Sequence, residues 1–273
     1  MRLRKAAGVL SLLVLALALA PRPVLAQALP LALAAELGEG PGGGALNSGR
    51  SAGSGDEIQA LALLDGFYRA RAHRPLWVLD SEAGPRARHL SELLIAADLD
   101  GLDPADYRAG QIRDLLGAHA PEELARLEVL LSLGLVRYAA DLGQGRTTPH
   151  IADPELFVFR EEVKKQEVLA AAAEAVDLDS FIDGYRPQTV RYDRQKVALA
   201  EYRALALQGG WRAIPEGETL KAGMTDPRVG LLRQRLRLVG DLKPRGDLAE
   251  TGGDPNFYDA QLETAVKWMQ YRH

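Results

Sequence analysis

The residue types best suited to covalent chemistry are missing or badly placed in this sequence. The chain of 273 residues contains no cysteine, which excludes a thiol nucleophile, thiolate metal ligands and disulfides. The segment Gly49–Gly53 fits the Gly-x-Ser-x-Gly pattern of serine hydrolases. That pattern requires a strand before the serine and a helix after it. A stretch rich in alanine and glycine surrounds it here, so we interpret it as part of a linker.

Acidic and histidine residues also lack the spacing of a known kind of site. Asp98, Asp100 and Asp103 flank Gly101, but a calcium loop has its glycine at the sixth position and ends in a glutamate. Paired acids that a glycoside hydrolase could use occur at Glu161, Glu162, Asp177 and Asp179. Nothing places them across a sugar ring. The histidines follow no ligand spacing, at His73, His89, His119, His150 and His273. We therefore predict no metal, no cofactor and no catalytic residue.

The last segment offers side chains suited to binding. A core-facing stripe at helical spacing is formed by Leu262, Val266, Met269 and His273. Trp268 falls outside this stripe, beside Lys267 and Tyr271. An exposed tryptophan beside a tyrosine and cations suits stacking on sugars and pairing with carboxylates. Arg233, near Arg235 and Arg237, could meet anionic peptides. Alternatively, Trp268 covers the preceding helical part of the chain or a third helix that would follow, and the arginines form a solvated face.

An export signal is indicated at the start of the chain. Basic residues precede an apolar stretch over Ala6–Ala20, and Val24–Ala26 has the small-residue pattern of a cleavage site. The apolar stretch is shorter than the roughly 20 residues that span a bilayer. We expect cleavage after Ala26, with an uncleaved anchor as the alternative. The mature protein is then periplasmic and has no membrane span.

The mature chain is acidic, and its charge is uneven. The net charge is −4 for the whole sequence, and the first 26 residues contain four basic residues and no acid, so residues 27–273 have a net charge of −8. Residues 211–273 hold 10 basic and 9 acidic residues, which leaves −9 for residues 27–210. Nucleic acid and anionic lipid need a basic surface, so neither is an expected partner.

The sequence that follows a glycine-rich segment shows helical periodicity over most of its length. Residues 27–55 are predicted to be a flexible linker because they bury too little apolar surface to offset their backbone entropy. From Asp56 onward, amphipathic spacing and caps predict a mainly α fold. Helices are expected at about residues 56–68, 85–97, 104–116, 121–138, 162–176, 190–208 and 226–239, and from 258 onward.

Two stretches of the chain resemble the large L,D-transpeptidases of the bacterial cell envelope. The helical scaffold domain of that family is similar to the segments Phe67-Tyr68, Pro75–Trp77, Asp100–Tyr107, Arg137–Arg146 and Gly209–Pro215. Its peptidoglycan-binding module is similar to Asp226–Val229 with Leu232, Leu236 and Gly240, and to Tyr258-Asp259 with Leu262, Ala265 and Val266. The resemblance implies an irregular helical scaffold domain over 56–210, a connection over 211–225, and an incomplete three-helix module over 226–273.

This resemblance implies a scaffold and binding role in the cell wall. The acyl transfer of the family uses a cysteine with a nearby histidine in a later domain, and this chain has no cysteine. Peptidoglycan is the expected partner, with other cell-wall synthesis proteins as further candidates. Two alternatives stay open: the chain is a truncated reading of a full-length transpeptidase, or it is an envelope adaptor. Structural roles are predicted for Arg146 beyond a helix end, for Trp211 and for the helix cap Asp226.

Overall fold

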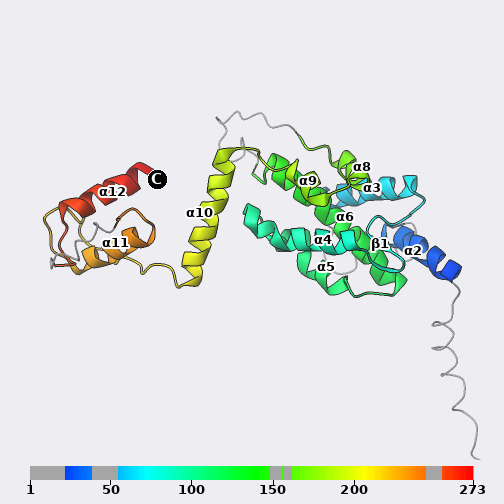
Figure 1. The fold of residues 1–273 in the computed structure, drawn as a ribbon, viewed down its shortest axis with the longest axis horizontal. Helices are drawn as coiled ribbons and strands as arrows, with labels where there is room; N and C mark the ends of the chain where they lie inside the picture. The colour runs from blue at the N-terminus through cyan, green and yellow to red at the C-terminus, as the bar shows by residue number, and fades with distance from the viewer. Residues whose placement is uncertain (1–21, 39–54, 148–154, 156–161, 244–253, 273) are drawn as a thin grey trace, which may run out of the picture. The chain divides into compact units, whose positions relative to one another are not determined.

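The computed structural model describes residues 22–38, 55–147, 155, 162–243 and 254–272 (Figure 1). Over these residues the chain is mainly α, which confirms the predicted fold class. The chain divides into two compact units, residues 1–193 and 194–273, and each is described by itself. The scaffold predicted over residues 56–210 therefore contains this division, which lies within one helix.

The first unit holds most of the helices and one short hairpin. Its elements are α2 (Arg22–Glu36), α3 (Gly55–Ala70), β1 (Val78–Leu79), β2 (Glu82–Ala83), α4 (Pro85–Ile95), η2 (Ala96–Asp100), η3 (Pro104–Tyr107), α5 (Ala109–Leu115), α6 (Pro121–Gln144), α8 (Lys165–Glu174), α9 (Leu178–Asp183) and the start of α10 (Val190–Leu207). Strands β1 and β2 pair antiparallel, with Val78 opposite Ala83.

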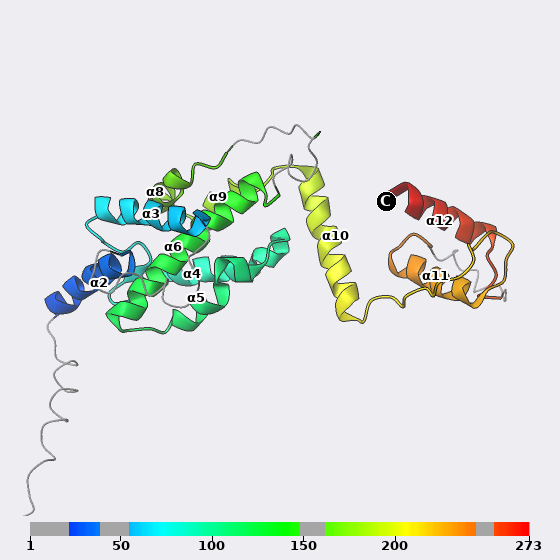
Figure 2. The same cartoon turned by 180° about the vertical axis from the view of Figure 1, so that it is seen from behind.

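Helix α6 is the centre of this unit, with α3 and α8 on one side and α4 and α5 on the other (Figures 1 and 2). Pro121 occupies its first turn together with Glu122 and Glu123, where proline fits the backbone and acids complement the helix dipole. Most of its residues are buried, because neighbours cover more than one of its faces. Gly145, with a φ of 73°, follows the last turn and ends the helix.

A buried carboxylate within α6 fixes the segment that leads into β1. Glu128 accepts hydrogen bonds from the Tyr68 hydroxyl at 2.7 Å and from the backbone N–H groups of Leu76, Trp77 and Val78. Burial raises the pKa of Glu128, although these hydrogen bonds oppose that shift. Ser132, one turn further along α6, accepts from the Trp77 indole N–H at 2.9 Å. The carboxylate therefore satisfies three backbone donors that the irregular chain would otherwise bury unpaired.

Three features of this unit differ from the sequence prediction. The flexible linker expected over 27–55 needs correction at its start, because α2 covers that part and packs against α6 with Leu29 and Leu33 buried. Their i, i+4 spacing gives a short apolar stripe that offsets the ordering entropy. The single helix expected over 104–116 is instead η3 followed by α5, because Arg108 has a φ of 55° between them. Helix α9 and the hairpin were not predicted.

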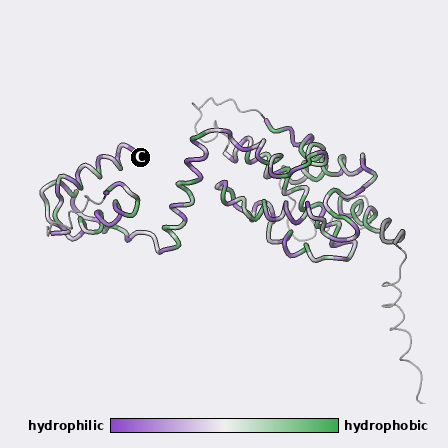
Figure 3. Tube along the Cα trace, viewed as in Figure 1, coloured by the Kyte–Doolittle hydropathy of each residue, from purple (hydrophilic) through white to green (hydrophobic). Residues whose placement is uncertain are grey.

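The second unit contains the rest of α10 and a small helical module. Its helices are α11 (Pro227–Leu238) and α12 (Ala260–Arg272), and an isolated bridge between Thr225 and Phe257 pairs the segments that precede them. The core of the module is formed by Val229, Leu236, Leu242, Tyr258, Leu262 and Ala265. Polar and apolar residues interleave along the helices (Figure 3), as expected for amphipathic helices with one buried face. Among the described helices, none is long and apolar enough to cross a membrane.

Candidate functional site

The side chains predicted to bind the cell wall lie together at the end of α12. Trp268 is 60% exposed and Tyr271 is 83% exposed, and their rings meet edge to face with centroids 5.7 Å apart. The Lys267 ammonium lies 2.8 Å from the Glu263 carboxylate, which raises the pKa of Lys267. We refer to Lys267, Trp268 and Tyr271 as the α12 surface. It combines flat apolar rings with a cation.

Helix α12 can present this surface because its other side is buried. Leu262 and Ala265 are inside the module, with Val266 and Met269 packed against the same core. This is the arrangement that the helical spacing predicts, apart from His273, which lies outside the described residues. Trp268 lies two positions after Val266 and one position before Met269, outside the helical spacing of the core residues, so the helix turns its ring outward.

Arg233, the fourth predicted binding residue, has a different environment. Its guanidinium donates to the backbone oxygen of Phe257 at 2.8 Å and to the Asp259 carboxylate at 2.9 Å, and the residue is only 8% exposed. Burial alone raises the pKa of Asp259, but hydrogen bonds from the Leu262 backbone N–H and from Arg233 lower it overall. The structure therefore places Arg233 inside the module, where it holds the chain that leads into α12.

Asp226 and Trp211 contact the same module. Asp226 precedes α11 and accepts from the Arg228 backbone N–H at 2.8 Å, as a helix N-cap does. Its other oxygen lies 2.8 Å from the Arg228 guanidinium, and the hydrogen bond from this side chain lowers the pKa of Asp226. Trp211 is 37% exposed and stacks under Arg235, whose guanidinium carbon lies 4.8 Å from the ring centroid.

In the first unit, a cleft of about 490 Å³ opens beside the second half of α6. We refer to it as the α6 cleft. Asp106 lies between two arginines that line it: Arg146 approaches one carboxylate oxygen to 2.6 Å and Arg137 approaches the other to 4.0 Å. Arg137 also donates to the backbone oxygen of Asp106 at 3.2 Å. The predicted structural residue Arg146 thus holds a facing carboxylate at the end of α6.

A tyrosine and a strained backbone complete this wall of the α6 cleft. The Tyr107 hydroxyl donates to Asp141 at 2.8 Å. Burial, together with this hydrogen bond to an acid, raises the pKa of Tyr107. Arg108 follows in the left-handed region, with φ 55° and ψ 31°, which costs a residue with a Cβ atom about 1 kcal/mol. This residue is both the C-cap of η3 and the N-cap of α5.

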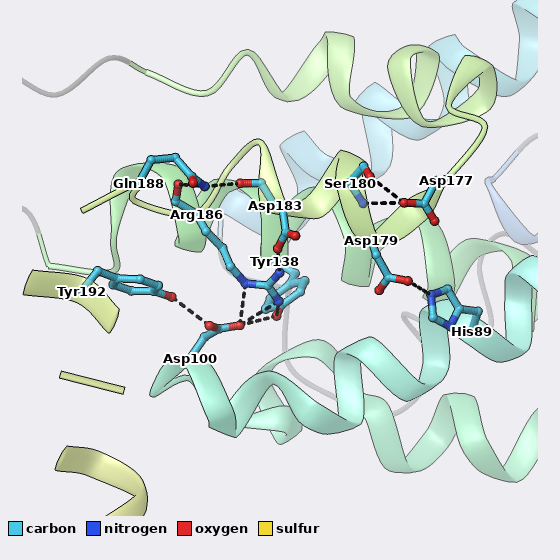
Figure 4. Close-up of polar contacts among 10 residues, drawn as sticks. All are labelled: His89, Asp100, Tyr138, Asp177, Asp179, Ser180, Asp183, Arg186, Gln188 and Tyr192. Atoms are coloured by element: carbon cyan, nitrogen blue, oxygen red, sulfur yellow. Dashed lines mark hydrogen bonds and ion pairs between the residues drawn. The ribbon is translucent and has the colours of Figure 1, made fainter. Parts of the chain in front are cut away.

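A second polar cluster of the first unit centres on the buried carboxylate of Asp100 (Figure 4). One of its oxygens accepts from the Arg186 guanidinium at 2.9 Å and from the Tyr138 hydroxyl at 2.8 Å, and the other accepts from the Tyr192 hydroxyl at 2.9 Å. Burial raises the pKa of Tyr138 and of Tyr192, and the nearby carboxylate adds to both shifts. We call these four residues the Asp100 cluster. It joins η2, α6 and the start of α10.

Of the paired acids noted in the sequence, Asp177 and Asp179 have partners. Asp177 caps α9 by accepting from the Ser180 backbone N–H at 2.9 Å, and Asp179 lies 2.9 Å from a ring nitrogen of His89 (Figure 4). Glu162 is exposed, and Glu161 lies outside the described residues. Within the described part of the chain, no group of three His, Cys, Asp or Glu side chains could hold a metal ion.

Comparison with known proteins identifies the class of the first unit. Residues 62–199 match the sequence profile of the Scaffold domain family, a stretch that contains α6, the charged residues of the α6 cleft and the Asp100 cluster. The chain therefore belongs to the Scaffold domain family. No curated protein and no solved structure matches it.

Proposed function

We propose that this protein is a non-catalytic, peptidoglycan-associated scaffold related to L,D-transpeptidases. The observation that carries the proposal is the α12 surface: Trp268 and Tyr271 are exposed side by side on a helix whose opposite face is buried. Stacking of sugar rings on aromatic faces needs this geometry, and Lys267 can meet the carboxylates of wall peptides. Membership of the Scaffold domain family supports the scaffold part of the role.

Arg233 enters this proposal as a supporting residue. Because its guanidinium already has three acceptors, it shapes the segment before α12 and does not reach a ligand. Asp226 contributes in the same way from the start of α11. The absence of cysteine from the sequence excludes a thiol nucleophile in this chain, and the role we propose for it is to hold and contact the wall. The expected export signal at the start of the sequence supports a periplasmic location for this proposed role.

Sedimentation with purified sacculi tests the proposal. The mature chain should sediment with intact sacculi at low and moderate salt, and Trp268→Ala and Tyr271→Ala should each reduce the bound fraction at least threefold. Leu207→Ala is a matched control, because Leu207 is an exposed apolar residue of the same unit outside the α12 surface. Wild-type protein that stays in the supernatant, or variants that bind as well as wild type, would contradict the proposal.

A further inference from the structure

The α6 cleft carries positive charge on a unit that is otherwise acidic. Residues 27–193 contain 16 Lys and Arg against 27 Asp and Glu, a net charge of −11. The ionisable residues that line the cleft have the opposite balance, with two acids, Asp106 and Asp141, against Arg108, Arg137, Arg146 and Lys165. A cationic hollow in an acidic body concentrates anions there while the rest of the surface repels them.

The arrangement of the two central arginines leaves donors for a further anion. Asp106 is the one carboxylate between Arg137 and Arg146, and it engages both. A guanidinium has five N–H donors in a planar fork that matches a carboxylate. Arg146 is 45% exposed and Arg137 is 55% exposed at the side chain, so water or a ligand reaches both. One acid therefore orients two guanidinium groups without saturating them.

The floor of the cleft indicates what the rest of the ligand is made of. Half-buried Leu133 lines it, and the almost fully buried side chains of Leu130, Val136 and Ala140 lie around it. Inorganic phosphate gains nothing from an apolar floor, whereas a small organic acid buries its aliphatic part there. The volume of about 490 Å³ falls within the range of small-molecule sites, roughly 300–1,000 Å³.

We infer that the α6 cleft binds a short peptide through its terminal carboxylate, with Arg137 and Arg146 on the carboxylate and the leucine floor under the side chains. This site is separate from the α12 surface, and carboxylate recognition does not depend on the proposed wall contact. If the proposed function also holds, the peptide ends of the cell wall supply such ligands.

Calorimetry and NMR titration of the mature chain test this inference. The probes are acetyl-alanyl-alanine in its all-L and all-D forms, the corresponding C-terminal amides, and inorganic phosphate. We expect saturable binding of at least one acid, with affinity at least tenfold weaker for its amide and for phosphate. Equal binding of acid and amide, binding of phosphate alone, or no saturation by any probe would overturn the inference.

Variants assign the binding to the cleft. Arg137→Gln and Arg146→Gln should each weaken binding of the acid at least fivefold, whereas Arg113→Gln should not. Arg113 is an exposed arginine next to an acid, Asp114, and does not line the cleft. Should Arg146→Gln fail to fold, the more exposed Arg137→Gln still gives the result. If Arg137→Gln binds the acid as tightly as wild type does, the assignment of binding to the cleft is refuted. The same variant should sediment with sacculi as wild type does, so the two tests distinguish failure of this inference from failure of the proposed function.

Discussion

Arg186 and Asp100, which lie 86 residues apart in the sequence, form an ion pair with a carboxylate that is only 1% exposed. Two tyrosine hydroxyls donate to the same carboxylate, so every oxygen of Asp100 has a partner. A buried charge is tolerated when it is paired and hydrogen-bonded in this way. The Asp100 cluster therefore fixes the turn after α9 and the start of α10 against η2 and α6 (Figure 4).

Replacing the carboxylate of the Asp100 cluster should destabilise the first unit. In Asp100→Asn the largely buried guanidinium of Arg186 loses its buried counter-charge and keeps only the exposed carboxylate of Asp183 as an ionic partner. The amide also cannot accept from all the donors that the carboxylate serves. We expect a loss of about 3 kcal/mol in the free energy of unfolding, measured by urea denaturation.

Tyr192→Phe is the graded control for this cluster. It removes one hydroxyl donor from Asp100 and keeps the ring and the ion pair, so the loss should be about 1 kcal/mol. A loss in Asp100→Asn no larger than that in Tyr192→Phe would show that the ion pair does not stabilise the fold.

Glu128 should make stability depend on pH in the direction opposite to that of an acid whose pKa is lowered by folding. Its folded pKa is raised above the ordinary value of 4.5, so between these two values the folded protein binds more protons than the unfolded chain. The free energy of unfolding then falls as pH rises through this window. We would measure the urea midpoints of wild type and Glu128→Gln from pH 4 upward. The difference between them gives the contribution of Glu128 titration to the free energy of unfolding.

Glu128→Gln should also lower stability throughout this range. The amide nitrogen of glutamine cannot accept, so some of the backbone N–H groups of Leu76, Trp77 and Val78 lose their partner. A loss of about 2–3 kcal/mol is expected. The advantage of wild type over the variant should be largest at the acidic end, and an advantage that grows with pH would contradict the raised pKa.

Gly134 should not tolerate a methyl group. A Cβ atom there would lie 2.8 Å from a methyl carbon of Leu94 and 3.3 Å from the backbone oxygen of Tyr107, and overpacking of this kind costs about 1–3 kcal/mol. Gly110→Ala, in α5, is the matched control, because nothing lies within 4 Å of its Cβ position. It should stabilise the protein by about 0.5–1 kcal/mol. Thermal melts of the two variants should therefore move in opposite directions.

Helix caps and apolar periodicity predicted the long helices well. The elements that these patterns did not predict have local causes. Pro121 with two acids correctly indicated the start of α6, and Asp226-Pro227 indicated the start of α11. Asp103-Pro104 indicated the right start for η3, but nothing in the sequence showed that Arg108 would leave the helical region four residues later. Helix α9 has six residues and each strand two, which is too short for a periodic signal.

The predicted site residues show the same contrast between features set by local sequence and features set by tertiary packing. The outward position of Trp268 could be predicted because it depends only on the period of one helix. The burial of Arg233 could not, since its acceptors Phe257 and Asp259 come from a segment more than 20 residues away. The α6 cleft likewise joins Asp106 to Arg137 and Arg146 through tertiary packing, and short motifs carry no information about such pairings.

Helix α2 offers the most direct test of the fold, because a flexible linker was predicted where it lies. Leu33 is fully buried against the core of the first unit, whereas Leu31, two residues earlier, is 71% exposed. Leu33→Ala should therefore cost about 2–4 kcal/mol, and Leu31→Ala, the same change in the same helix, should cost less than about 0.5 kcal/mol. Urea denaturation of the mature chain measures both. Equal and small effects would mean that the segment does not dock on α6, as a flexible linker would not, whereas a large loss confined to Leu33→Ala requires a packed helix.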